Sequence, residues 1–88
     1  MKNVCACYFL GKGCAEKDTG YSGYNLLRYE GWISEPTVDA CAKTCRKISN
    51  CEFWTYTRKK KCIPKSKKGK SNPVKGSTSG SKDCNVSK

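Results

Sequence analysis

The sequence predicts a small, disulfide-stabilised domain in which one α-helix lies on a β-hairpin. The chain has 88 residues and eight cysteines, a density typical of secreted domains whose cores are too small to be stable without cross-links. Between residues 38 and 48, apolar residues and cysteines recur at helical spacing. Between residues 51 and 57, large aromatic side chains recur at every second position on one face, which is the period of a strand. A helix followed directly by a strand is therefore expected in the middle of the chain.

The helix is expected to begin after Thr37 and to end at Asn50. One of its faces carries four apolar or thiol side chains that are three or four residues apart, namely Val38, Cys41, Cys45 and Ile48. Thr37 suits the N-cap position, and Asn50 tolerates the left-handed backbone that often ends a helix. Both cysteines are therefore expected to point inward.

A β-hairpin is expected directly after the helix. The alternation from Cys51 to Thr57 places Trp54 and Tyr56 on one face of a strand, where we expect them to be core side chains. A polar turn over residues 58–61 and a returning strand over residues 62–66 would complete the hairpin.

This helix and hairpin resemble the apple or PAN module, in which a helix carries two cysteines separated by three residues. In that family the next strand carries a cysteine and a Phe-Thr-Tyr-like run, which corresponds to Cys51 and to Trp54–Tyr56 here. The following strand of the family reads Cys, any residue, Leu, Lys, and Cys62–Lys65 is similar to it. Pro64 departs from the pattern and suggests an edge strand or a break, because proline cannot donate to a sheet ladder.

Two outer matches extend the resemblance to residues 14–84. Cys14 and the segment Gly20–Leu26 look like the opening cysteine of the family and its Gly-x-Asp-Leu, with Asn25 in the place of the aspartate. Ser79–Cys84 looks like the closing Ser-Gly-x-x-x-Cys.

The resemblance implies an α+β fold, a twisted antiparallel sheet of about five strands that cradles one helix. It also implies pairing of the first cysteine of the framework with the sixth, the second with the fifth and the third with the fourth: Cys14–Cys84, Cys41–Cys62 and Cys45–Cys51. Cys5 and Cys7 lie outside this framework. They could bond to each other, or one could bond elsewhere in a larger parent protein.

Three further segments complete the expected fold. The apolar run Val4–Leu10 predicts a strand rather than a signal peptide, because no cleavage site follows it. Tyr24–Ile33 is rich in Leu, Tyr and Trp and predicts one or two strands broken near Gly31. Lys67–Ser81 is almost wholly Lys, Gly, Ser, Asn, Thr and Pro, and predicts a long, mobile surface loop. No stretch approaches the length of an apolar membrane span.

The composition favours neither a metal site nor catalysis. Histidine is absent and no two cysteines have C-x-x-C spacing, so no metal or cofactor is expected. No histidine can act as a base, the thiols are expected to be oxidised, and the seven acids fall at no spacing typical of a paired-carboxylate site. We therefore expect a module that is not an enzyme, and any proteolysis linked to the family would belong to other domains.

Positive charge is a functional signal that does not depend on the resemblance. The net charge is +11, and eight cations without an acid among them fall within thirteen residues: Arg58, Lys59, Lys60, Lys61, Lys65, Lys67, Lys68 and Lys70. Such a cluster can bind sulfated glycans, anionic lipid or nucleic acid by counterion release. The alternative is a solvated loop that keeps the domain soluble. Nucleic acid is not expected as a partner, because the setting is extracellular and no nucleic-acid-binding motif is present.

Aromatic residues outside the hairpin form a second candidate contact surface: Tyr21, Tyr24, Tyr29 and Trp32. Side chains of this type stack on sugar rings or anchor protein partners. The alternative is ordinary packing.

The resemblance implies a binding module. Apple modules occur in plasma kallikrein, coagulation factor XI, plasminogen and hepatocyte growth factor, and in the microneme adhesive proteins of apicomplexan parasites, which this Lys- and Ser-rich chain resembles most. We expect one secreted adhesion module of a larger multi-module protein, monomeric in isolation and released from an organelle such as the microneme. Its partner would be a host-surface glycan or protein, or another secreted adhesin. The alternatives are a glycosaminoglycan-binding domain that uses the lysine cluster and a free-standing cationic, cysteine-rich effector.

Overall fold

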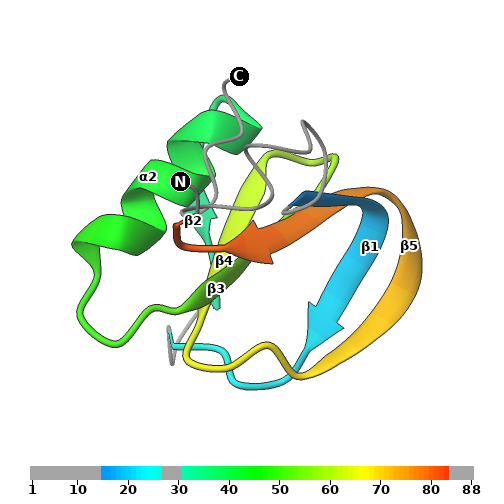
Figure 1. The fold of residues 1–88 in the computed structure, drawn as a ribbon. Helices are drawn as coiled ribbons and strands as arrows, with labels where there is room; N and C mark the ends of the chain where they lie inside the picture. Colours follow the sequence, from blue (N-terminus) through cyan, green and yellow to red (C-terminus); the bar gives the residue numbers. More distant parts are fainter. Residues whose placement is uncertain (1–14, 27–30, 84–88) are drawn as a thin grey trace, which may run out of the picture.

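In the computed structural model, which describes residues 15–26 and 31–83, five strands form one sheet and a helix lies against it (Figure 1). The elements in chain order are β1 (Ala15–Ser22), β2 (Ile33–Ser34), α2 (Val38–Lys47), β3 (Phe53–Tyr56), β4 (Lys61–Lys65) and β5 (Lys70–Ser81). The order across the sheet is β1-β5-β3-β4-β2, and every neighbouring pair is antiparallel. The predicted α+β architecture is confirmed. In the part of the chain that is described, no helix is long and apolar enough to cross a membrane.

The helix α2 begins and ends as its sequence predicts. The Thr37 hydroxyl oxygen accepts a hydrogen bond of 3.0 Å from the Ala40 amide, which satisfies one of the amides left open at a helix start. Asn50, just beyond the helix, has a φ of +72°, a conformation that asparagine adopts more readily than most residues. Cys41 and Cys45 are fully buried on the face toward the sheet.

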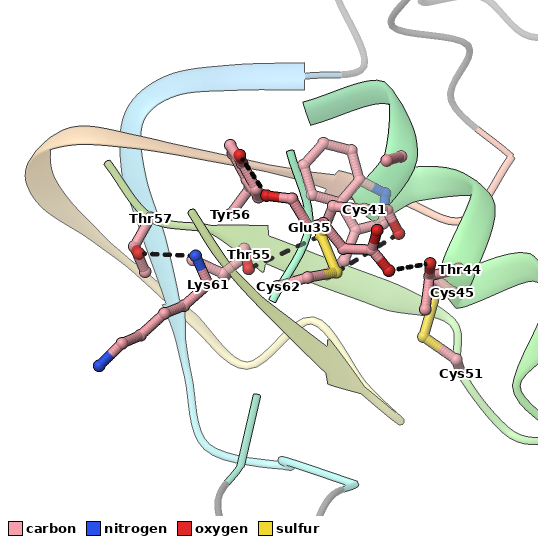
Figure 2. Close-up of a disulfide and its surroundings, with 12 residues drawn as sticks. Glu35, Cys41, Thr44, Cys45, Cys51, Thr55, Tyr56, Thr57, Lys61 and Cys62 are labelled. Carbon is pink, nitrogen blue, oxygen red and sulfur yellow. Dashed lines mark hydrogen bonds between the residues drawn. A yellow bond between two sulfur atoms is a disulfide. The ribbon is translucent and has the colours of Figure 1, made fainter. Parts of the chain in front are cut away.

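Two disulfides tie α2 to the hairpin. Cys41–Cys62 joins the helix to β4, and Cys45–Cys51 joins it to the segment that enters β3; Figure 2 shows both beside the helix. These are two of the three pairings implied by the family resemblance, and both are confirmed. The expected Cys14–Cys84 bond and the cysteines at positions 5 and 7 lie outside the described residues.

The core lies between α2 and the helix-facing side of β3 and β4. Trp54 and Tyr56 of β3 pack against the four disulfide-bonded cysteines, as predicted, and their exposed fractions are 0% and 8%. The Trp54 indole donates to the Ser81 carbonyl at 2.9 Å, and the Tyr56 hydroxyl donates to the Glu35 carbonyl at 2.8 Å. Both polar tips are thus satisfied inside a small core.

The prediction of a long loop over residues 67–81 is wrong. The twelve-residue β5 (Lys70–Ser81) is the longest described strand and lies between β1 and β3. It pairs with β1 at both of its ends and with β3 over residues 78–81, and its buried side chains, Ser77 and Ser79, are small and polar. A strand of this kind needs few apolar residues, because ladder and hydroxyl hydrogen bonds satisfy its buried groups.

A bend in the β1–β5 pair carries β1 across the face of the sheet opposite α2 (Figure 1). The register shifts between Lys17, which faces Thr78, and Thr19, which faces Pro73. At this point Asp18 has a φ of +55°, and its carboxylate accepts a hydrogen bond of 2.8 Å from the amide at position 76. Local irregularities of this type bend a strand pair and increase its twist.

A chain of hydrogen bonds joins β1, β3 and β5 beneath this bend. The Tyr21 amide donates to the Thr55 hydroxyl at 3.1 Å, and the Ser79 hydroxyl donates to the Thr19 carbonyl at 2.8 Å. Because Ser79 has a single hydroxyl hydrogen, Thr55 is the donor in the 2.7 Å bond that joins the two hydroxyls. The Tyr21 ring packs edge-on against Phe53, with the ring centroids 5.9 Å apart.

The strand β4 continues through Pro64, so the predicted edge strand or break is wrong. It pairs with β3 on one side and with β2 on the other. The Pro64 carbonyl accepts a hydrogen bond from the Leu26 amide at 3.0 Å, and a residue of an antiparallel strand directs its nitrogen and its carbonyl to the same side. The missing N–H therefore faces away from β3, where no ladder bond depends on it.

The strands expected over Tyr24–Ile33 are largely absent from the described part of that segment. Ile33 begins the two-residue β2, and Asn25 forms an isolated bridge to Lys65. Residues 27–30 lie outside the description, as does the strand expected over Val4–Leu10.

Candidate functional site

The cations that are close together in the sequence are divided between the two ends of β4. Residues 58–60 form the turn before this strand, and residues 67, 68 and 70 follow it; Figure 1 shows these segments in yellow-green and yellow. A five-residue strand spans about 16 Å. The structure therefore divides the cluster into two surfaces.

The first surface is built on the tight turn between β3 and β4. The Thr57 carbonyl accepts from the Lys60 amide at 2.9 Å, and the Thr57 hydroxyl accepts from the amides of Lys59 and Lys61 at 3.2 and 3.3 Å. Lys60 has a φ of +65°. Figure 2 shows the Lys61 side chain extending away from the disulfides. A rigid turn thus directs several cations outward.

Neighbouring strands add to this surface. The stem of Arg58 lies over Gly76, where an added Cβ would be only 2.9 Å from the Arg58 Cδ, so Lys75 lies close to the turn. On the β2 side, the Lys61 ammonium is 4.6 Å from the centre of the Trp32 ring. We call the whole set the hairpin-turn surface: Arg58, Lys59, Lys60, Lys61, Lys75 and Trp32.

The cations of the hairpin-turn surface make no ion pair with an acid in the described ranges. The ion pairs found there are elsewhere: Lys43–Asp39, Lys68–Glu16 and Lys82–Glu52. The Asp18 carboxylate, which lies at the same corner of the sheet, accepts a hydrogen bond from the backbone instead. Positive charge at the turn is therefore exposed and poorly compensated.

At the other end of β4, Lys65 is buried, with an exposed fraction of 3%. Its ammonium donates to the Gly23 carbonyl at 3.0 Å and to the Asn25 side-chain oxygen at 2.5 Å. Burial lowers the pKa of Lys65, because the charged form loses hydration. This lysine holds the segment before β2 in place and does not face an external anion.

The predicted aromatic contact residues occupy different environments. Tyr21 is buried, and burial together with the charge and hydrogen bonding of Glu16 raises its pKa to about 12. Trp32 is half-buried, and Tyr24 is 53% exposed. Tyr29 lies outside the described residues. Of the three that the structure describes, Tyr24 is the most exposed.

Comparison with known proteins identifies the family. The family model described as "PAN domain" matches residues 14–87 of the chain. The chain belongs to the PAN domain family. PAN domains are non-catalytic binding modules for protein or carbohydrate, and disulfide-rich PAN domains are typical of secreted proteins.

A solved structure shares the fold of this PAN domain. It is a solution structure of the two N-terminal apple domains of Toxoplasma gondii microneme protein 4, with a TM-score of 0.67 and 21% identity. The match covers 78% of this chain and 42% of that chain, so this PAN domain spans less than half of the two-domain structure. At this identity the likeness concerns the fold alone. No curated protein sequence matches the chain.

Sequence reasoning did not include Lys75 in the cationic site of this PAN domain. Lys75 lies seventeen positions after Arg58 in the sequence, in the segment that was predicted to be a loop. It reaches the turn because β5 pairs with β3 and Gly76 lies against Arg58. No local sequence signal marks that contact.

Proposed function

We propose that this PAN domain is an extracellular adhesion module that makes one of several weak contacts with a host-cell surface or a secreted partner. Family membership carries this proposal, because PAN domains are binding modules. The fold likeness to microneme apple domains supports a role in parasite attachment, with release from an organelle such as the microneme. Tandem copies would convert weak contacts into useful avidity.

The cross-linked core suits such a role outside the cell. Two disulfides join the helix to the hairpin within an 88-residue chain. Bonds of this type persist in oxidising compartments and stabilise domains whose apolar cores are small. The exposed surfaces at the two ends of β4 are then available for contact on a rigid scaffold.

The experiment that tests the adhesion function is binding of the oxidised domain to host cells and to a glycan array. Both should be run at about 0.15 M and about 0.5 M salt, where the screening length falls from about 8 Å to a few ångströms. Saturable binding to cells or glycans supports adhesion. Absence of binding to cells, glycans and secreted adhesins, even for a tandem dimer, would contradict it. Lysis of vesicles by the isolated domain would instead favour the free-standing effector.

A second candidate function is glycosaminoglycan binding, and the hairpin-turn surface favours it. Arg58, Lys59 and Lys60 are exposed and make no ion pair with a described acid. Binding of a polyanion to such a surface releases counterions, so the logarithm of the affinity should fall linearly with the logarithm of the salt concentration.

A matched pair of charge reversals tests this second function. Lys59→Glu with Lys60→Glu changes the turn, whereas Lys43→Glu with Lys47→Glu makes the same charge change on the exposed side of α2. If the turn is the site, the first pair should lower heparin affinity about tenfold or more, and the second pair should have a much smaller effect. Equal losses from both pairs would show that net charge alone attracts the polyanion.

A further inference from the structure

Tyr24 is an exposed aromatic residue in a strained backbone conformation. Its exposed fraction of 53% is larger than that of Val74, the other exposed large hydrophobic side chain in the described ranges. Its φ is +59°, in the left-handed region that side chains with a Cβ rarely enter. Strain of this kind persists only where the surrounding structure imposes it, and it concentrates at ligand-binding and catalytic sites.

The surrounding structure holds Tyr24 from both sides. The Tyr24 carbonyl accepts from the Ser66 amide at 3.0 Å, and the Leu26 amide donates to a carbonyl of β4 at 3.0 Å. The buried Lys65 ammonium donates to the Gly23 carbonyl at 3.0 Å. The backbone before and after the tyrosine is therefore held on β4.

Gly69 gives the tyrosine ring its position. This glycine has a φ of +70°, and a Cβ there would collide with the Ser22 carbonyl oxygen and lie 3.3 Å from the Tyr24 Cδ2. The ring thus lies beside bare backbone, and the residue as a whole is 53% exposed. A rigid aromatic surface of this kind binds a flat apolar group with little loss of conformational entropy.

A positive charge accompanies the ring. The ammonium of the exposed Lys67 is 5.7 Å from the centre of the Tyr24 ring. The next lysine in the chain, Lys68, pairs with Glu16 at 3.7 Å and lies over the Tyr21 ring. Lys67 is in no ion pair with a described acid, and its exposed ammonium lies over the Tyr24 ring.

We propose that Tyr24 and Lys67 form a binding site for a pyranose that carries a carboxylate or a sulfate, a ligand assignment that rests on the binding function proposed above. The acid group of the sugar pairs with the exposed ammonium of Lys67 and draws it off the tyrosine ring, and the apolar face of the sugar stacks on the ring in its place. A protein partner fits less well, because protein hot spots need a desolvated, well-packed centre, whereas a single open ring with one adjacent cation matches one sugar unit. Lys65 and Gly69 are positioning residues for this site.

The test compares three variants of the oxidised domain on surfaces that display glucuronate, sulfated galactose or unmodified galactose. Tyr24→Asn removes the ring at a position where asparagine tolerates the backbone, so the fold and the melting temperature should be kept. We expect this variant to lose about tenfold or more in affinity for an acidic sugar. Tyr24→Phe should bind as the parent does, and Lys67→Gln should weaken acidic-sugar binding and reduce its salt dependence.

Val74→Thr is the matched control, because it alters the other exposed apolar side chain and should leave binding unchanged. Binding to glucuronate alone, or to sulfated galactose alone, identifies which acid group is recognised and supports the site. Three results would overturn it: no binding to either acidic sugar, equal binding to unmodified galactose, or acidic-sugar binding that survives in Tyr24→Asn. Host-cell adhesion that persists without acidic-sugar binding would refute this site and leave the adhesion function standing.

Discussion

Asn25→Asp should stabilise this PAN domain by giving the buried Lys65 a charged partner. The Lys65 ammonium now donates to two neutral acceptors, the Gly23 carbonyl and the Asn25 side-chain oxygen. The family pattern has aspartate where this chain has Asn25, and the structure places that side chain 2.5 Å from the ammonium. The donor of this bond is already charged, and the substitution adds a charge on the acceptor without a change in side-chain size, so that both partners are ionised.

The expected gain follows from the environments of the two groups. Exposed ion pairs contribute about 0–1 kcal/mol, and a pair with one buried partner contributes more because water and salt screen it less. Lys65 is buried and Asn25 is exposed, so the free energy of unfolding should rise by about 1–2 kcal/mol. For a domain of this size, each kcal/mol raises the melting temperature by about 4–8 °C.

Thermal unfolding followed by circular dichroism at neutral and at acidic pH is the assay. The ammonium lowers the pKa of the new carboxyl in the folded state. The gain is therefore complete above the ordinary aspartate pKa of about 3.9 and is lost as pH falls through the lowered value. A melting temperature that is unchanged or lower at neutral pH would refute the reasoning, as would a gain that survives at about pH 2. The gain should also disappear in a Lys65→Met background, which completes a double-mutant cycle.

Three further predictions concern the sheet and the disulfides. Thr55→Val leaves the buried Tyr21 amide without its acceptor, so denaturant unfolding should show a loss of about 1–3 kcal/mol, and Thr55→Ser should lose less. Burial and Glu16 raise the pKa of Tyr21 to about 12. The stability that the neutral phenol of Tyr21 contributes is therefore complete below the ordinary tyrosine pKa of about 10 and is lost as pH rises through about 12. Tyr21→Phe should lessen the fall in melting temperature at alkaline pH. The Cys41–Cys62 bond closes a loop of sequence separation 21, worth about 3 kcal/mol, so the reduced chain should unfold or become molten. A sharp, well-dispersed NMR spectrum in excess reductant would contradict the last prediction.

The elements that the sequence predicts correctly are those that local signals specify. The N-cap at Thr37, the left-handed Asn50 and the cysteine spacing of α2 all act within one or two helical turns. The alternation around Trp54 likewise marks β3 without reference to distant residues. Such signals are strong because backbone geometry requires them wherever the chain folds.

Strand β5 could not be predicted in this way. Its residues are mostly polar, small or charged, and this composition favours a loop when the segment is considered alone. It becomes a strand because β1 and β3 pair with its two edges. Paired residues are 48 to 65 positions apart for β1 and 22 to 28 positions apart for β3. The buried Ser79 hydroxyl is satisfied only by Thr19 and Thr55 from those strands.

The sequence predicted which types of residue the candidate sites contain, but not where those residues lie in the fold. By itself, the sequence determined the local elements, the cysteine framework that marks the family and the excess of positive charge. The tertiary structure alone decided which of those charges are exposed and which are buried. It buried Lys65, brought Lys75 to the hairpin turn, and left Tyr24 open beside Lys67. The physical reason is that exposure and charge pairing depend on which strands become neighbours, and that choice is made by contacts between residues far apart in the chain.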